Sequence, residues 1–288
     1  MRRLGESERA RILEYVGKEP EMNLFFIGDI ENYGIDSEIV TIYANETADG
    51  WDFLLLKYYD FYLLYSQNET YDTAAAAEFL QNRTVDTISA KASLLRQLIP
   101  FFPDRFYQET QMCRCGADDL KAFDRCFSHA STRNAPEISC TSNGLHNLRK
   151  EHSFYIRALS VADLDAMLQL LLQIEEFSHT YQHPDKARQQ LAQELQSGEL
   201  AVGAFEGDRL ISIAKTSASN SKSAMLTGVA TLSDRRGQGC ASAVVHSLCR
   251  QSFQAGREFL CLFYDNPKAG RIYRRIGFCE IGGYGMLK

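Results

Sequence analysis

The stretch Gly228-Val-Ala-Thr-Leu-Ser-Asp-Arg-Arg-Gly-Gln-Gly-Cys-Ala241 joins an apolar run to a helical pattern. The run, residues 225–232, has the character of a strand. After the turn, apolar side chains recur at 241, 244, 245 and 248, the spacing of one helix face. Residues 259–263 are continuously apolar, which is typical of a buried parallel strand. The pattern predicts a strand–turn–helix–strand unit, in which backbone N–H groups and the helix dipole form an anion site suited to a pyrophosphate.

Three glycine-rich pyrophosphate loops were compared with this turn. The P-loop is excluded because no Gly-Lys-Ser/Thr follows the glycines. The dinucleotide-binding fingerprint fits poorly because Ser242 stands where its third glycine or alanine belongs. The third loop fits: Arg236-Gly-Gln-Gly239-Cys-Ala241 matches Arg/Gln-x-x-Gly-x-Gly/Ala. That pattern resembles the coenzyme A pyrophosphate loop of the GNAT superfamily of acyl-CoA-dependent N-acyltransferases.

A second motif, 265–278, follows the apolar run at 259–263. It resembles the Asn-x-x-Ala-x-x-x-Tyr-x-x-x-Gly-Phe signature of the same superfamily, with all five residues in place: Asn266, Ala269, Tyr273, Gly277 and Phe278. Each also has a structural explanation, since Asn266 before Pro267 would start a helix in any protein and Gly277 would end one. Their joint spacing behind the loop favours the resemblance, which covers residues 153–288.

The resemblance implies an α/β fold with a mixed sheet, and the predicted elements of this half agree: strand, helix, helix, three strands, helix, strand, helix, strand. We predict a GNAT N-acetyltransferase domain at 153–288, a linker at 136–152 and a degenerate GNAT-like domain at 1–135. Helices, a meander and a strand–helix pair in the first part echo the second. No glycine lies between Ile88 and Leu94, where the pattern predicts its phosphate loop, so we expect no coenzyme A there.

The resemblance also implies roles for residues of the second half. Backbone N–H groups would hold the pyrophosphate with the charge of Arg236, and the residues concerned are Gly237, Gln238, Gly239, Cys240, Ala241 and Ser242. A backbone N–H within Val229, Ala230 and Thr231 would polarise the acyl carbonyl. Asn266 and Ala269 would contact the pantetheine arm. Tyr273 would be the general acid for the leaving thiolate.

The sequence offers three candidates for the general base. Glu175, Glu176 and His179 fall in the loop that flanks the acceptor in the family, and a solvated helix end is the alternative for each. Cys240 beside the loop is no nucleophile in this interpretation, because direct transfer needs none.

Composition limits the remaining classes. A net charge of −6 and a pI near 5.6 argue against nucleic-acid binding. No apolar run reaches membrane-spanning length, and no signal peptide is recognisable. Cysteines within predicted helices and strands indicate reduced thiols and a cytoplasmic protein. Cys113 and Cys115 are too closely spaced for a zinc site, so no metal is expected.

The predicted function is an acetyl-CoA-dependent N-acetyltransferase that acts, as a monomer or homodimer, on a small-molecule or peptide amine. A coenzyme-A-binding or interaction module without turnover is the alternative.

Overall fold

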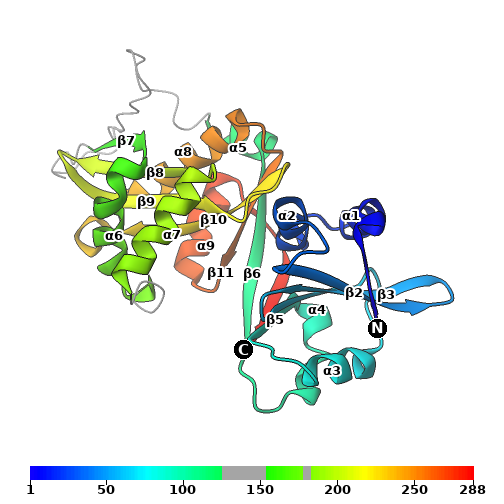
Figure 1. Ribbon diagram of the computed structural model, residues 1–288. Coiled ribbons are helices and arrows are strands. Elements are labelled where there is room, and N and C mark those ends of the chain that lie inside the picture. Colours follow the sequence, from blue (N-terminus) through cyan, green and yellow to red (C-terminus); the bar gives the residue numbers. More distant parts are fainter. Residues whose placement is uncertain (125–153, 178–182) are drawn as a thin grey trace. The chain divides into compact units, whose positions relative to one another are not determined.

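The computed structural model describes residues 1–124, 154–177 and 183–288 (Figure 1). These residues form two compact units. Unit 1 comprises Met1–Arg114, Phe263–Pro267 and Glu280–Lys288, and unit 2 comprises Cys115–Leu262 and Lys268–Cys279. The predicted linker at 136–152 lies outside the described residues, and the predicted boundaries at 135 and 153 remain predictions.

Unit 1 is a sheet with helices on both faces. Its strands, in spatial order, are β1 (Arg2–Arg3), β2 (Val40–Thr47), β3 (Gly50–Tyr58), β4 (Phe61–Tyr65), β5 (Thr87–Lys91), the last strand of the chain, β12 (Cys279–Leu287), and β6 (Tyr107–Gly116). Its α-helices are α1 (Arg9–Val16), α2 (Leu24–Tyr33), α3 (Thr73–Gln81) and α4 (Ala92–Leu95), with 3₁₀ turns at Glu6–Glu8 and Ile99–Phe101. Strands β2, β3 and β4 pair in antiparallel fashion, β4 pairs in parallel with β5, and β12 is antiparallel to β5.

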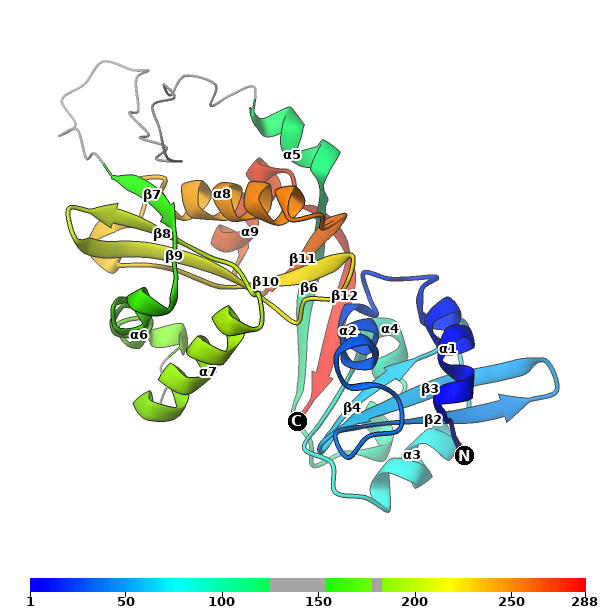
Figure 2. The same cartoon turned by 45° about the horizontal axis from the view of Figure 1, so that its top comes forward.

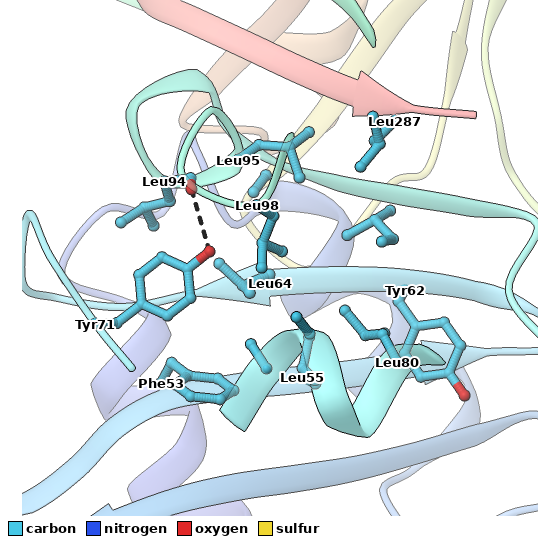
Figure 3. Close-up of a cluster of buried hydrophobic side chains, with 14 residues drawn as sticks. Phe53, Leu55, Tyr62, Leu64, Tyr71, Leu80, Leu94, Leu95, Leu98 and Leu287 are labelled. Atoms are coloured by element: carbon cyan, nitrogen blue, oxygen red, sulfur yellow. Dashed lines mark hydrogen bonds between the residues drawn. The ribbon is translucent and has the colours of Figure 1, made fainter. Parts of the chain in front are cut away.

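Strand β3 supplies side chains to two separate cores, because successive residues of a strand point to opposite faces. Leu54 and Leu56 pack with the buried residues of α1 and α2. Phe53 and Leu55 pack with α3 and α4 in the cluster of Figure 3, where the hydroxyl of Tyr71 donates to the carbonyl of Leu94. Apolar burial on both faces is what holds these helices to the sheet.

Unit 2 has the same layered construction. Its strands, in spatial order, are β11 (Phe259–Tyr264), β10 (Ser223–Thr231), β9 (Arg209–Ser217), β8 (Ala201–Glu206) and β7 (Tyr155–Ala158). Its helices are α5 (Ala117–Asp124), α6 (Leu164–Leu172), α7 (Pro184–Gln196), α8 (Cys240–Gln254) and α9 (Pro267–Ile276), with 3₁₀ turns at Val161–Asp163, Glu175–Phe177 and Ser233–Arg235. Figure 2 shows α6 and α7 on one face of the sheet and α8 on the other.

Both halves of the chain repeat one order of elements. The first half runs β1-α1-α2-β2-β3-β4-α3-β5-α4-β6, and the second runs β7-α6-α7-β8-β9-β10-α8-β11-α9-β12. The predicted α/β mixed-sheet class and the repeated architecture are therefore confirmed. One detail differs from our expectation. In unit 1, helix α3 joins the parallel strands β4 and β5, so the turn that matches the glycine turn of unit 2 is at 66–72, and not between Ile88 and Leu94.

Candidate functional site

Strand β10 has two paired neighbours for only part of its length. Its parallel register with β11 runs from Ser223 opposite Phe259 to Met225 opposite Cys261. Beyond Met225, β10 continues to Thr231 with β9 as its registered partner. The second half of β10 therefore has a backbone edge that is not used in the pairing with β11.

A β-bulge interrupts β10 in this second half. Thr227 lies opposite Lys215, whereas the next registered pair is Ala230 with Ile213, so Gly228 and Val229 form the irregularity. Gly228 has φ +60°, a left-handed conformation that glycine adopts without strain. Bulges re-aim the groups of a strand and increase its local twist.

The residues after the bulge are firmly held by β9. The hydroxyl of Ser212 donates to the carbonyl of Ala230 at 2.9 Å and lies 2.7 Å from the hydroxyl of Thr231. The N–H of Leu232 donates to the carbonyl of Ile211 at 3.0 Å. The predicted carbonyl-polarising residues, Val229, Ala230 and Thr231, thus comprise one bulge residue and two residues fixed by β9.

The turn before α8 is open toward solvent. Gly237 and Gly239 have φ values of +76° and +86°, and a Cβ on either would meet no atom within 4 Å. Gly239 is the N-cap of α8, so no side chain caps the first turn, and that turn carries no acidic residue. Such a helix start can receive an anion on its backbone N–H groups.

The matching turn in unit 1 has the opposite character. Asp72 is the N-cap of α3, and its carboxylate accepts from the N–H of Ala75 at 2.9 Å. Residues 66–72 contain no glycine. The carboxylate of Asp72 therefore occupies the position that a phosphate would take at this helix start, and its negative charge would repel one. The residues of this turn do not fit a pyrophosphate.

The two arginines beside the glycine turn have different surroundings. Arg235 is bound to Glu206 at 2.5 Å and to Asp234 at 3.1 Å. Arg236 is exposed, and its Nε donates to the carbonyl of Thr231 at 3.3 Å. This contact ties the guanidinium of Arg236 between the end of β10 and the turn. Arg235 is committed to carboxylates, and Arg236 is the arginine that the sequence motif singled out.

Other predicted residues of the turn are placed as follows. The amide of Gln238 donates to the carbonyl of Asp234 at 3.2 Å and stiffens the turn. Cys240 is 1 % exposed, which agrees with the interpretation of this thiol as a packing residue. Ala241 and Ser242 lie half-buried in the first turn of α8.

Helix α9 carries the second motif. Asn266 is exposed and directly precedes the helix, Ala269 is half-buried, and Tyr273 is 8 % exposed. The ring of Tyr273 makes an edge contact with Phe278 at 6.0 Å between centroids. The N–H groups of Gly277 and Phe278 both donate to the carbonyl of Tyr273, and Gly277 has φ +121°. The Gly-Phe pair of the motif therefore ends the helix and packs against Tyr273.

The structure leaves the base candidates as predictions. Glu175 is exposed in the 3₁₀ turn after α6. Glu176 belongs to the same turn, and His179 lies outside the described residues. Two residues near the bulge were not identified from the sequence, the buried Lys215 on β9 and the half-buried Glu194 on α7, whose side chains form an ion pair at 2.6 Å. A lysine directly after the mainly apolar run 210–214 was the available signal.

Comparison with known proteins agrees with this geometry. The sequence model of the acetyltransferase (GNAT) family matches residues 165–278. This part of the chain is a GNAT domain. No curated protein matches the chain.

Solved structures extend the likeness in fold beyond the GNAT domain. A GCN5-related N-acetyltransferase-like protein from Streptococcus suis aligns with a TM-score of 0.58 at 13 % identity, covering 99 % of both chains. A Drosophila protein aligns with a TM-score of 0.63 at 14 % identity, over 99 % of this chain and 97 % of its own. A tandem GNAT protein from the clavulanic acid biosynthesis pathway aligns with a TM-score of 0.58 at 9 % identity, over 99 % and 96 %. The likeness in fold therefore extends over the first half of the chain, which is a GNAT-like region in its fold, in front of the GNAT domain.

Two further observations concern partners and metals. Among the described residues, no helix is both long and apolar enough to cross a lipid bilayer. The described ranges also contain no group of three or more His, Cys, Asp and Glu side chains able to hold a metal ion.

A glycine comparison tests the bulge. In Gly228→Ala, an alanine would have to adopt the strained backbone angle φ +60°, and its Cβ would lie 3.1 Å from Cγ of Lys215. Gly237→Ala carries the backbone strain alone, because its Cβ would meet open space. We expect Gly237→Ala to lower the free energy of unfolding by about 1 kcal/mol and Gly228→Ala by more, as measured by urea denaturation. Equal losses would contradict the contact between Lys215 and the bulge.

Proposed function

We propose that the GNAT domain transfers an acetyl group from acetyl-CoA directly to a primary amine of a small molecule or peptide. The observation that carries the proposal is the open, uncapped start of α8 with its two left-handed glycines. It lies at the end of β10, the strand whose pairing with β11 has already stopped. Acetyl-CoA, when bound, supplies the acetyl group as an activated thioester.

In this proposal the chain holds the cofactor at three places. The N–H groups of 237–242 bind the pyrophosphate, and Arg236 adds positive charge at the same turn. Asn266 and Ala269, at the start of α9, contact the pantetheine arm. A backbone N–H within 229–231 donates to the thioester oxygen, where negative charge develops as the amine attacks.

Proton movements complete the reaction. A C–N bond forms at the acyl carbon, the C–S bond breaks, and the hydroxyl of Tyr273 gives its proton to the leaving sulfur. The buried ring is held by Phe278, so its hydroxyl has a restricted position. The proton of the attacking amine leaves through a base, for which Glu175 and Glu176 remain our candidates. We also propose a cytoplasmic location.

Cofactor binding is tested by thermal denaturation with and without acetyl-CoA. At about 100 times its dissociation constant, a ligand of the native state adds about 2.7 kcal/mol to the free energy of unfolding. We expect a clear upward shift in Tm for the wild type and none for Gly239→Glu, whose carboxylate would occupy the anion site. The control is Gly198→Glu, at another exposed glycine of positive φ, which should retain the shift. The same Tm with and without acetyl-CoA in the wild type would refute the proposal.

The role of Tyr273 is tested by Tyr273→Phe, which keeps the ring against Phe278 and removes the acid. General acid catalysis contributes about 10²–10⁴-fold, so kcat should fall by at least about 100-fold while the KM for acetyl-CoA changes little. Thiol release with a panel of primary amines measures both. Tyr155→Phe, at a ring stacked on Phe205, is the control. An undiminished kcat in Tyr273→Phe would assign the general acid to another residue. If none of the amines gives thiol release with the wild type, the non-catalytic module is favoured.

A further inference from the structure

Lys215 and Glu194 form an ion pair in an unusual place for charged side chains. Lys215 is in β9, between Ala214 and Thr216, and its side chain is 9 % exposed. Glu194 is on α7, with its side chain 20 % exposed, and its Oε2 lies 2.6 Å from Nζ of Lys215. Removing two charges from water costs free energy that pairing recovers only in part, so an apolar pair would serve stability as well. Stability alone therefore does not explain this ion pair.

The position of Lys215 relative to β10 suggests that role. Lys215 is the registered partner of Thr227, the residue immediately before the bulge. Its side chain then runs along Gly228, because a Cβ on that glycine would lie 3.1 Å from Cγ, 3.4 Å from Cδ and 3.3 Å from Cε. The aliphatic part of Lys215 thus packs against the bulge, where a Cβ at position 228 would crowd it.

Glu194 holds the ammonium end of the Lys215 side chain. Its second oxygen, Oε1, accepts from the amide of Gln190 at 3.1 Å, one helical turn earlier on α7. The carboxylate is therefore oriented by its own helix before it meets the lysine. With Nζ held at the carboxylate and Cα held in the sheet, the side chain of Lys215 is stretched across Gly228.

We propose that Lys215 and Glu194 are positioning residues for acyl transfer. By holding the Gly228–Val229 bulge, the pair keeps the backbone N–H of 229–231 aimed at the thioester oxygen. The inference rests on the proposed function, since it concerns the binding of acetyl-CoA in the same domain. Neither side chain is required to touch the acyl group.

The direct readout is the ¹³C chemical shift of acetyl-CoA labelled at the carbonyl carbon. A carbonyl that accepts a strong hydrogen bond becomes more polarised, and its carbon resonance moves downfield. We expect a downfield shift on binding to the wild type. In the double variant Lys215→Met/Glu194→Met, which removes both charges together, we expect this displacement to fall by at least half. The affinity for acetyl-CoA should change less than threefold, because the turn before α8 is untouched.

A second ion pair of unit 2 provides the matched control. Lys222 and Glu258 lie 3.5 Å apart with side chains 66 % and 59 % exposed. The double variant Lys222→Met/Glu258→Met should keep the full wild-type ¹³C displacement. If Lys215→Met/Glu194→Met fails to fold, Glu194→Gln, which keeps the shape of the side chain and removes its charge, is read in the same way.

The outcomes separate the two proposals. No binding of labelled acetyl-CoA to the wild type would refute the proposed function and with it this inference. Binding without a downfield displacement in the wild type, or an equal displacement in Lys215→Met/Glu194→Met, would overturn the positioning role and leave cofactor binding standing. A displacement lost in that variant and kept in the control supports it.

Discussion

The site of the GNAT domain depends on one constraint, the early end of the parallel pairing between β10 and β11. A parallel strand with two partners has all its backbone groups engaged in the sheet, and it can offer none to a ligand. Because the pairing stops at Met225, β10 continues for six residues with β9 as its registered partner. The bulge lies within this segment, and the glycine turn follows after its end. The proposed contact with the thioester oxygen uses backbone that the interrupted pairing releases.

The two halves of the chain share one topology, and the N-cap residue of the connecting helix decides whether that helix can receive an anion. In both halves, a helix joins two parallel strands after a three-strand meander. At α8 the cap is Gly239, which contributes no side chain. At α3 the cap is Asp72, whose carboxylate itself accepts from the helix N–H of Ala75. Asp is among the best N-cap residues for stability, and for the same reason it excludes an external anion. Stability of the helix and binding of a phosphate compete for the same N–H groups.

Local patterns made much of the GNAT domain predictable from the sequence. The apolar runs at 225–232 and 259–263 correspond to β10 and β11, and the helical spacing from 241 corresponds to α8. These features depend on neighbours within a few residues. The contact of Lys215 with Glu194 joins a strand to a helix 21 residues earlier, and no local pattern encodes it. The pairing of β12 with β5 joins Tyr284 to Lys91 and is still more remote. The bulge was in principle accessible, since a glycine inside a strand often marks one, as Gly228 does here.

We propose that the described residues hold one acyl-CoA site, at the open start of α8, and that the carboxylate of Asp72 closes the equivalent position in the first half. Isothermal titration of the full chain with acetyl-CoA measures this directly as a stoichiometry. We expect one molecule of acetyl-CoA to bind per chain. Two molecules bound per chain would show that the carboxylate of Asp72 does not exclude acetyl-CoA from the turn before α3. No binding would contradict the proposed site at the start of α8.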